Sequence, residues 1–329
     1  MRAVFYDRQG PAAEVLRFGD VPRPEPAPGE VRVRLLASGA NPADCKRRAG
    51  QGYGMEFPRV IPNSDGAGVV DALGPGADEA QAVGSRVWLY NAQRGRPFGT
   101  AAEFTCVPAD CVSPLPDDVP FEGGACLGIP AMTAHRCLFA DGPLDGLRVL
   151  VTGGGGAVGN YAVQLARWGG AALVLATARG GWQAEDALAA GAHAVIERGE
   201  DVAARVREAT DGRSVDRVVE VDFGGNAAVW SAVLANNGVV AAYASAGDPA
   251  PALPFGALMR RNIAVRTVML NNAPHAARRR AQADIVAWLR EAPRLHRIAG
   301  SFPLKETAAA HAAVEAGGKR GTVVVLPAE

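Results

Sequence analysis

The sequence has no excess of either charge, because its 329 residues contain 34 Lys plus Arg and 34 Asp plus Glu. A surface that binds nucleic acid needs an excess of basic residues, so this balance argues against a nucleic-acid partner. No apolar run approaches the roughly 20 residues that a membrane-spanning helix needs. The charged N-terminal segment MRAVFYDRQG does not look like a signal peptide. We therefore expect a cytoplasmic protein that binds neither a membrane nor nucleic acid.

Cysteine and histidine are also sparse. None of the five histidines stands in an HxxxH pattern or a similar cluster. The five cysteines form no disulfide-like framework, which is the default for a reduced, cytosolic chain; they are Cys45, Cys106, Cys111, Cys126 and Cys137. The sequence therefore predicts no metal site.

The hydrophobic pattern changes along the chain. The first third contains short strand candidates separated by turns rich in Pro and Gly, at 3–5, 31–37, 68–72, 85–90 and 102–107. In VRVRLLA (31–37) the arginines alternate with apolar residues, which is typical of a half-buried antiparallel strand. From about Phe121 onward, helical segments alternate with apolar strands, and a long helix is predicted over about 275–291. This alternation predicts βαβ units and a parallel sheet that helices cover on both faces.

Residues 147–169, LRVLVTGGGGAVGNYAVQLARWG, combine an apolar strand, a glycine-rich turn and an amphipathic helix. In this context the glycines let the backbone approach a pyrophosphate, and the helix N-terminus offers free N–H groups and a positive dipole end to the phosphates. A second apolar strand, AALVLATA, follows at the right distance. The segment therefore predicts a dinucleotide site in which the pyrophosphate is held by Gly155, Gly156, Ala157 and Val158.

The end of this second strand indicates which nicotinamide dinucleotide binds. NAD-binding folds usually place Asp or Glu there, where it binds the ribose hydroxyls. Here the position is Ala178, followed by Arg179, and Arg198 follows the next apolar strand. The missing acid and the two cations favour a 2′-phosphate, so we predict NADPH as the cofactor. The alternative is that Arg179 is a solvated loop arginine.

Several segments together resemble one known family, the medium-chain dehydrogenase/reductase superfamily, and within it the zinc-free, zeta-crystallin-like quinone oxidoreductases. They are ASGANPAD (37–44), IPNSDGAGVVDALGPGA (61–77), GIPAMTAHRCL (128–138), VTGGGGAVG (151–159) and EAGGKRGTVVVL (315–326). The resemblance covers nearly the whole chain. It implies an α/β protein with a Rossmann-type doubly wound parallel sheet domain (123–267) and a GroES-like β-barrel catalytic domain (1–122 and 268–329).

The resemblance also bears on metal chemistry. Alcohol dehydrogenases of this superfamily hold a catalytic zinc through cysteine and histidine ligands. In this chain the first ligand position carries Asn41, the histidine position is Ser64, and the third position falls near Ile129. Without a Lewis acid, hydride donation stays feasible only to an acceptor that conjugation has already activated.

The candidate catalytic residues are Asn41, Lys46, Tyr53 and Asp65. The resemblance places the amide of Asn41 near the nicotinamide and the substrate carbonyl; a turn-forming Asn before a proline is the alternative. Lys46 replaces a tyrosine that often contacts ligand in the family, and Tyr53 is a candidate to replace that ring. Solvation of Lys46, packing of Tyr53 and a structural role for Asp65 are the corresponding alternatives, and for Asp65 the structural role is favoured.

Further cofactor contacts are expected where open α/β sheets bind ligands, at the carboxyl ends of the strands. The resemblance adds Asn41 and, near the nicotinamide amide, Thr133. The remaining candidates are Asn226, Tyr243, Ala244, Ser245, Ala246, Val268, Met269 and Leu270. Asn271 and Asn272 either line the substrate pocket or cap the helix that begins at His275.

We therefore expect an NADPH-dependent, zinc-independent reductase that transfers hydride to a small molecule, either a quinone or an α,β-unsaturated carbonyl. One alternative is an enoyl reductase for a specific biosynthetic intermediate, because Lys46 would suit an anionic substrate. Another is a non-catalytic NADPH-binding protein. Residues 263–270 form an apolar strand that is expected at the sheet edge. Such an edge is a pairing hazard unless covered, and in the family it typically pairs across a dimer, so we predict a homodimer.

Overall fold

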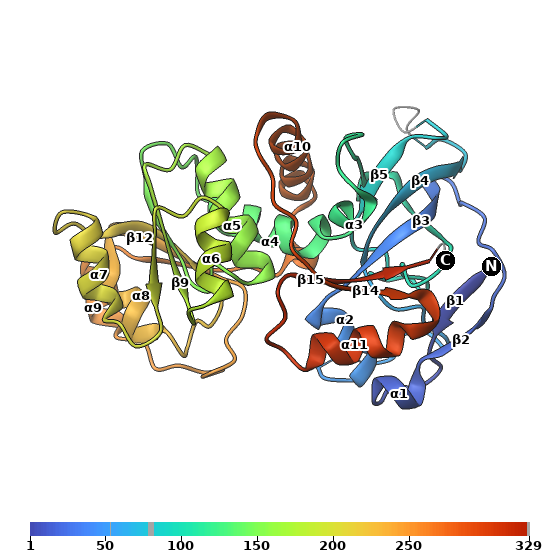
Figure 1. The fold of residues 1–329 in the computed structure, drawn as a ribbon, viewed down its shortest axis with the longest axis horizontal. Coiled ribbons are helices and arrows are strands. Elements are labelled where there is room, and N and C mark those ends of the chain that lie inside the picture. Colours follow the sequence, from blue (N-terminus) through green and yellow to red (C-terminus); the bar gives the residue numbers. More distant parts are fainter. Residues whose placement is uncertain (53, 78–81, 328–329) are drawn as a thin grey trace. The chain divides into compact units, whose positions relative to one another are not determined.

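The computed structural model describes residues 1–52, 54–77 and 82–327. The chain divides into two compact units, which we call the barrel unit (Met1–Ile129 and His296–Glu329) and the parallel-sheet unit (Pro130–Leu295). Figure 1 labels their elements along the chain. Among the described residues no helix is both long and apolar enough to cross a bilayer.

The parallel-sheet unit contains a six-stranded sheet in the order β10-β9-β8-β11-β12-β13, and every neighbouring pair is parallel. Counted along the chain, this order is the 3-2-1-4-5-6 arrangement of a doubly wound nucleotide-binding fold. The predicted fold class is therefore confirmed. The strands are β8 (Arg148–Val151), β9 (Leu173–Ala178), β10 (Ala194–Glu197), β11 (Val215–Glu220), β12 (Leu234–Ala242) and β13 (Ala264–Thr267).

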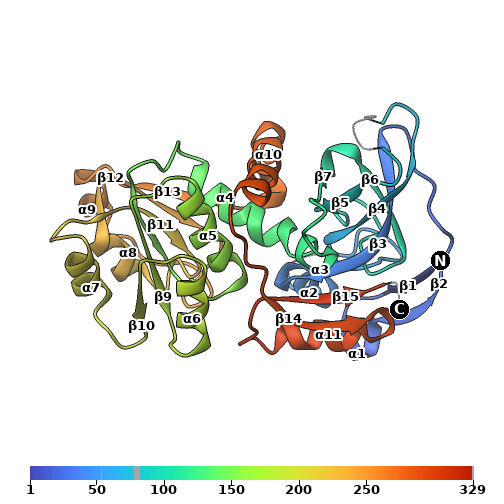
Figure 2. The same ribbon diagram turned by 45° about the horizontal axis from the view of Figure 1, so that its top comes forward.

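Helices cover both faces of this sheet. Within the unit, α4, α5 and α6 lie on one side of the strands, and α7, α8 and α9 lie on the other (Figures 1 and 2). The strands between them are apolar in both directions, and Val149, Leu150 and Val151 are fully buried. The helices are α4 (Met132–Phe139), α5 (Ala157–Trp168), α6 (Trp182–Ala189), α7 (Val202–Ala209), α8 (Ala227–Val233), α9 (Phe255–Arg260), α10 (His275–Glu291) and the 3₁₀ turn η3 (Leu270–Asn272).

The barrel unit is built on a mostly antiparallel seven-stranded sheet in the order β14-β15-β3-β4-β5-β7, with β6 also paired to β3, and on the hairpin-like pair β1-β2. Its strands are β1 (Arg2–Phe5), β2 (Arg17–Asp20), β3 (Glu30–Ala40), β4 (Asp65–Leu73), β5 (Arg86–Leu89), β6 (Phe104–Pro108), β7 (Val112–Pro114), β14 (Ile298–Pro303) and β15 (Thr322–Leu326). Its helical segments are α1 (Ala12–Val15), α2 (Pro42–Ala49), η1 (Ala109–Cys111), α3 (Phe121–Gly124), the π-helical turn η2 (Leu127–Ala131), whose last two residues belong to the other unit, η4 (Leu304–Glu306) and α11 (Thr307–Glu315).

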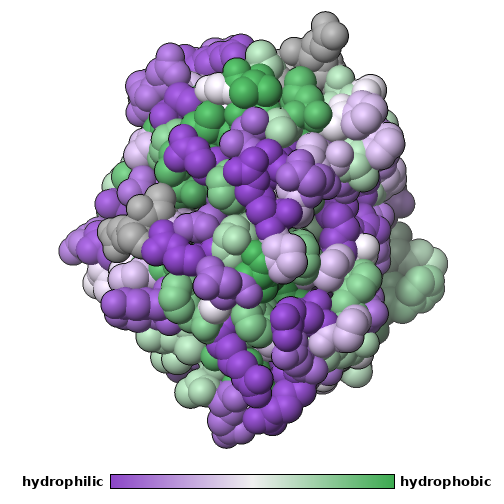
Figure 3. Space-filling view, turned by 90° about the vertical axis from the view of Figure 1, so that its right-hand side faces the viewer, coloured by the Kyte–Doolittle hydropathy of each residue, from purple (hydrophilic) through white to green (hydrophobic). Residues whose placement is uncertain are grey.

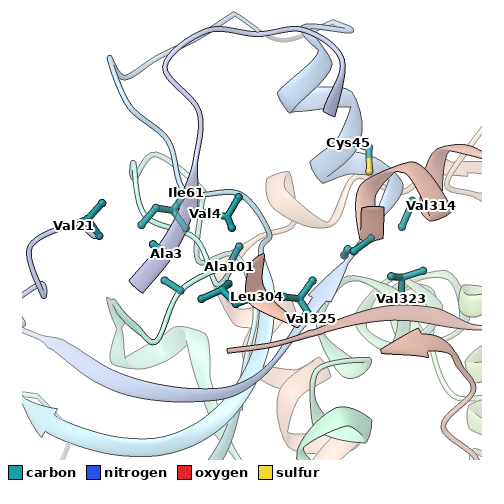
Figure 4. Close-up of a cluster of buried hydrophobic side chains, with 13 residues drawn as sticks. Ala3, Val4, Val21, Cys45, Ile61, Ala101, Leu304, Val314, Val323 and Val325 are labelled. Carbon is teal, nitrogen blue, oxygen red and sulfur yellow. The ribbon is translucent and has the colours of Figure 1, made fainter. Parts of the chain in front are cut away.

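One apolar cluster of the barrel unit joins the two ends of the chain. Figure 4 shows Val4 and Ile61 from the N-terminal part near Val325 of β15, and Cys45 of α2 beside Val314 of α11. Burial of these side chains ties the C-terminal segment to the first strands. On the face drawn in Figure 3, hydrophilic residues surround small hydrophobic groups, as is normal for a protein surface.

The predicted alternation along 31–37 is wrong at one position. Arg34 is exposed, but Arg32 is only 5% exposed. Its guanidinium donates to Asp71 at 2.6 Å and pairs with Glu25 at 2.7 Å. The register of β3 against β4 shifts between Arg32 and Val33, so a bulge replaces strict alternation.

The boundary between the two units differs from the predicted one. Residues 268–295 were expected with the barrel domain, but they belong to the parallel-sheet unit. The reason is the packing of α10 on α4, where Nε2 of His135 lies 2.8 Å from Oδ2 of Asp284. The predicted helix over 275–291 itself is confirmed.

Candidate functional site

The glycine-rich turn of the parallel-sheet unit joins β8 to α5. Gly153 has φ +68°, a conformation that glycine adopts without strain. At Gly159 an added Cβ would lie 2.2 Å from the carbonyl oxygen of Gly153, so the helix and the turn require glycine at their contact. Gly156 is the N-cap of α5, and Ala157 and Val158 begin the helix. Their N–H groups stand at a helix N-terminus, where phosphate binds.

The turn also contacts α6, which explains one predicted site residue differently. A Cβ at Gly155 would lie 2.5 Å from the carbonyl oxygen of Gln183. A Cβ at Gly156 would meet only the carbonyl oxygen of Gly153, at 3.3 Å. Gly155 is therefore required by internal packing, whereas Gly156 lies on the open side of the turn.

The ends of β9 and β10 bring the two predicted arginines to neighbouring positions. Ala178 pairs in register with Glu197, so Arg179 and Arg198 follow directly from paired residues on parallel strands. Both side chains are exposed, and neither guanidinium takes part in an ion pair within the described residues. An added Cβ at Gly180 would lie 2.7 Å from Oε2 of Glu197, so that carboxylate lies at the same edge. Sequence reasoning looked for an acid only at the end of β9 and missed the one at the end of β10.

A second missed carboxylate lies at the carboxyl end of β11. Glu220 is fully buried, and its Oε1 accepts from Oγ1 of Thr152 at 2.9 Å and from Nδ2 of Asn226 at 2.8 Å. Burial raises the pKa of Glu220. Asn226, predicted as a cofactor contact, thus gives one amide hydrogen to this carboxylate. A signal was present in the sequence, because VVE ends an apolar strand on a charge.

The predicted residues 243–246 lie in the loop that follows β12. The N–H of Phe223 donates to the carbonyl oxygen of Ala244 at 2.9 Å, and the N–H of Gly224 donates to Oγ of Ser245 at 2.9 Å. The loops after β11 and β12 are therefore bonded to each other. Burial raises the pKa of Tyr243, and Ala246 is exposed.

The other predicted cofactor residues lie on α4 and after β13. Thr133 is buried on α4. The N–H of Val268 donates to the carbonyl oxygen of Ala242 at 2.8 Å, Met269 is 57% exposed, and Leu270 is buried in η3. Of the two alternatives for Asn271 and Asn272, the capping role is wrong, because α10 has Pro274 at its N-cap.

In the barrel unit, Asn41 is the N-cap of α2 and is held at two points. Its backbone N–H donates to Oδ2 of Asp44 at 2.9 Å, and its Nδ2 donates to Oδ2 of Asp65 at 2.8 Å. Asn41 is 4% exposed, and both carboxyl groups are buried. The two carboxyl groups fix the backbone and the amide of Asn41 together.

Asp65, the first residue of β4, also accepts from the N–H of Ile129 at 2.7 Å, again through Oδ2. Among the described residues its buried Oδ1 has no hydrogen-bond partner. A Cβ at residue 128 would lie 2.1 Å from that oxygen, so glycine is required there. Burial and the nearby Asp44 raise the pKa of Asp65 well above its usual range. Burial also raises the pKa of Asp44, although Oγ of Ser64 donates to its Oδ1 at 2.9 Å.

Of the remaining catalytic candidates, Lys46 lies apart from this cluster. Lys46 is exposed on α2, and it lines a cavity of about 410 Å³ together with Cys45, Gln51 and Glu315. Tyr53 lies outside the described residues. The structure therefore brings together Asn41 and Asp65, but not Lys46.

The three positions at which the resemblance expects zinc ligands meet in the same cluster. Asn41 and Ser64 donate to the carboxyl groups of Asp65 and Asp44, and Ile129 donates its backbone N–H. An amide, a hydroxyl and an apolar side chain are not the thiolate and imidazole set that zinc prefers. Within residues 1–52, 54–77 and 82–327, no group of three or more His, Cys, Asp and Glu side chains is arranged to hold a metal ion.

Comparison with known proteins agrees with this division of the chain. An alcohol dehydrogenase GroES-like domain model matches residues 27–117, and a zinc-binding dehydrogenase model matches residues 157–288. The quinone oxidoreductase of Pseudomonas aeruginosa is 30% identical over 322 residues, covering 95% of this chain and 96% of that protein. The quinone oxidoreductase of Rattus norvegicus is 33% identical over 225 residues, which cover 67% of this chain and 66% of that protein.

A solved structure extends the comparison to the fold. A mycobacterial protein in complex with NADPH is similar to this chain with a TM-score of 0.84 at 30% identity, covering 99% of this chain and 100% of that one.

Proposed function

Because the chain belongs to the quinone oxidoreductase group of the medium-chain dehydrogenase/reductase superfamily, we propose that it transfers hydride from NADPH to a quinone or an α,β-unsaturated carbonyl without zinc. The relatives' activity supports the reductase class. The choice of acceptor depends on the chemistry of the barrel-unit cluster.

The observation that carries the proposal is the hydrogen bonding around Asn41, Ser64 and Ile129. Their polar groups are bound to the carboxyl groups of Asp44 and Asp65 rather than arranged as metal ligands. An alcohol would need a Lewis acid to lower its pKa. A quinone or an enone does not, because conjugation makes its carbon electrophilic and stabilises the product anion.

The glycine-rich turn supports NADPH as the cofactor. The open side of the turn at Gly156 and the N–H groups that begin α5 suit a pyrophosphate. When bound there, NADPH supplies the hydride. Arg179 and Arg198, on neighbouring strand ends, suit the 2′-phosphate as charge-assisted donors. The carboxylate of Glu197 at the same edge would repel the 2′-phosphate unless one of the arginines pairs with Glu197.

The chain's own contribution to the reaction is to orient a donor. One hydrogen of the Asn41 amide is given to Asp65, which fixes the amide plane. The second hydrogen is the one that we assign to the oxygen of the substrate, where negative charge develops. A fixed donor needs no reorganisation during the reaction, which is the basis of electrostatic catalysis.

The test is an NADPH-oxidation assay over quinones, enones and acyl thioesters, with the protein dialysed against a chelator and its metal content measured. We expect turnover of quinones or enones by metal-free protein. Turnover that requires zinc would contradict the proposal. Retained NADPH binding without any turnover would favour a non-catalytic NADPH-binding protein.

Reduction of an enoyl intermediate is the second candidate, because Lys46 is exposed on α2, the helix whose N-cap is Asn41. An ammonium group there would attract an anionic acyl substrate. A preference for charged acyl thioesters over quinones in the same assay would select this candidate.

We also propose a homodimer that pairs through β13, the edge strand of the parallel sheet. Val265 of β13 is 42% exposed, and Phe255 and Met259 of the preceding helix α9 are 74% and 59% exposed. Apolar side chains beside an unpaired strand edge favour pairing with another chain. Light scattering should give twice the mass of 34.0 kDa, and Val265→Lys should shift the measured mass toward that of a single chain.

The five free cysteines support a reducing, cytoplasmic environment.

A further inference from the structure

A chain of buried hydrogen bonds in the barrel unit links α11 to the start of β4. Nε2 of His311 lies 2.9 Å from Oδ1 of Asn63, and Nδ2 of Asn63 lies 2.9 Å from Oγ of Ser38. Oγ of Ser38 lies 2.7 Å from Oγ1 of Thr100, and Oγ1 of Thr100 lies 2.7 Å from the carbonyl oxygen of Asp65. All five residues are fully buried, so water does not compete with these bonds.

The chain has a single direction. A carbonyl oxygen only accepts, so the hydroxyl of Thr100 donates to Asp65 and must accept from Ser38. The oxygen of Ser38 then accepts from the amide of Asn63, whose Oδ1 accepts from His311. Reversing the Asn63 amide would leave the oxygens of Ser38 and Thr100 facing each other without a hydrogen between them. Nε2 of His311 therefore carries a hydrogen, and burial, which lowers the pKa of His311 to about 3, keeps the ring neutral.

Asn63 is the residue of this hydrogen-bond chain whose backbone is held as well as its side chain. It has φ +72°, the left-handed region, two residues before Asp65. The turn closes on the facing segment, because the N–H of Thr100 donates to the carbonyl oxygen of Asn63 at 3.0 Å. A Cβ at Gly99 would meet the carbonyl oxygens of residues 61, 62 and 63 at 2.6 Å or less. Side chain and backbone of Asn63 are thus both fixed, and they set the position of Asp65.

We infer that His311 is a positioning residue for the reaction proposed above, acting through Asn63, Ser38 and Thr100 on Asp65, and through Asp65 on the amide of Asn41. This inference rests on the proposed function for its kinetic consequence. The chain ends on a backbone carbonyl and not on a carboxyl group, so it carries no proton to Asp65. Its role is to hold Asp65, whose Oδ2 in turn holds Asn41 at 2.8 Å.

The direction of the chain determines the informative variants. His311→Gln keeps an N–H donor that reaches toward Oδ1 of Asn63, whereas His311→Leu removes the donor and leaves that oxygen buried without a partner. Thr100→Val breaks the last bond, and Thr100→Ser keeps the hydroxyl. Thr105→Val is the matched control, because the buried Oγ1 of Thr105 donates to the carbonyl oxygen of Phe98 at 3.3 Å, outside the chain.

The kinetic test measures kcat, KM and the dissociation constant of NADPH for each folded variant. We expect His311→Leu and Thr100→Val to lower kcat by about tenfold or more, because small displacements of a catalytic group are costly. The affinity for NADPH should stay unchanged, and His311→Gln, Thr100→Ser and Thr105→Val should keep kcat near that of the parent. A folded His311→Leu variant with parental kcat, or equal losses in His311→Gln and His311→Leu, would overturn the inference.

A spectroscopic test separates this inference from the proposed function. With ¹⁵N-labelled asparagine, the side-chain signal of Asn41 is identified by its loss in Asn41→Ala. It should shift in His311→Leu and Thr100→Val and stay in place in His311→Gln and Thr105→Val. If the parent protein reduces no acceptor, the proposed function fails, and these shifts still decide the positioning role. An Asn41 signal that does not shift in His311→Leu and Thr100→Val would reject the positioning role of His311.

Discussion

The glycine-rich turn of the parallel-sheet unit is formed by backbone, whereas the polar cluster of the barrel unit is formed by side chains. The turn is a backbone structure that needs glycine at Gly153 for its φ of +68° and at Gly159 for close packing. The cluster is made of side chains that are distant in sequence, such as Asn41, Asp65 and His311. A site formed by backbone is encoded by a short contiguous motif, whereas a site formed by side chains depends on long-range folding. The two sites should therefore respond differently to substitution.

The largest effect should follow a change in the backbone structure. In Gly159→Ala the new Cβ would lie 2.2 Å from the carbonyl oxygen of Gly153, which is backbone and cannot move without opening the turn. We expect the affinity for NADPH to fall about 100-fold, because the helix N-terminus no longer meets the pyrophosphate. Fluorescence titration measures this affinity. Gly256→Ala on α9 is the control, since its Cβ would meet only the end of the Arg260 side chain at 3.4 Å; parental affinity in a folded Gly159→Ala variant would refute the backbone account.

The next effect should follow loss of the amide in the side-chain cluster. Asn41→Ala removes the donor assigned to the substrate oxygen and leaves Asp65 without one of its two donors. We expect kcat to fall about 100-fold, as for the loss of one oxyanion donor, with little change in the affinity for NADPH. Steady-state kinetics and NADPH titration check this split. A kcat within twofold of the parent would remove Asn41 from the mechanism.

A smaller effect is expected at the strand ends that we propose to bind the 2′-phosphate. Arg179→Ala combined with Arg198→Ala should weaken NADPH by about tenfold or more and leave NADH unchanged, because each lost charge-assisted bond is worth about 1.5–3 kcal/mol before solvent screening of these exposed side chains. Competition titrations with the two cofactors measure the ratio. Arg213→Ala is the control, since Arg213 is exposed and its ion pair is with Asp211 at 4.0 Å. An equal loss of affinity for NADH and NADPH would show that the arginines do not bind the 2′-phosphate.

The smallest effect is a pH dependence of stability in Asp65→Asn. The folded pKa of Asp65 is raised, so its contribution to stability is complete below the unfolded pKa and is lost as the pH rises through the folded pKa. Asp65→Asn lacks this loss, so its unfolding free energy relative to the parent should increase from about pH 4 upward, by about 1.4 kcal/mol for each pKa unit of the shift. Urea denaturation at several pH values measures the difference. A difference in unfolding free energy that is constant or decreases with pH would mean that the pKa of Asp65 is not raised in the folded protein.

The sequence was most informative where structure is local. The strand, turn and helix at 147–169 and the helix at 275–291 follow from hydrophobic periodicity and glycine content. It was less informative where a distant partner decides the outcome. Arg32 is buried because Asp71 and Glu25 receive its guanidinium, and residues 268–295 join the parallel-sheet unit because α10 packs on α4.

The site shows the same limit. Glu220 and Glu197 end their strands, but only the hydrogen bond from Thr152 to Glu220 and the closeness of Gly180 to Glu197 show how they lie at the carboxyl edge of the sheet. Ser38 and Asn63 lie in segments that resemble the family, but nothing in the sequence signals their hydrogen bonds, which exist only after β3, β4 and the C-terminal segment fold together. Lys46 was attractive as a replacement for a tyrosine, yet it points to a separate cavity beside Glu315.

We propose that a conjugated acceptor is reduced with NADPH and without a metal. The most direct measurement is kcat/KM for a quinone or enone with NADPH and with NADH, using protein shown to be metal-free after chelation. We expect undiminished turnover after chelation and a clear preference for NADPH. Activity that disappears with the metal and returns on addition of zinc would contradict it.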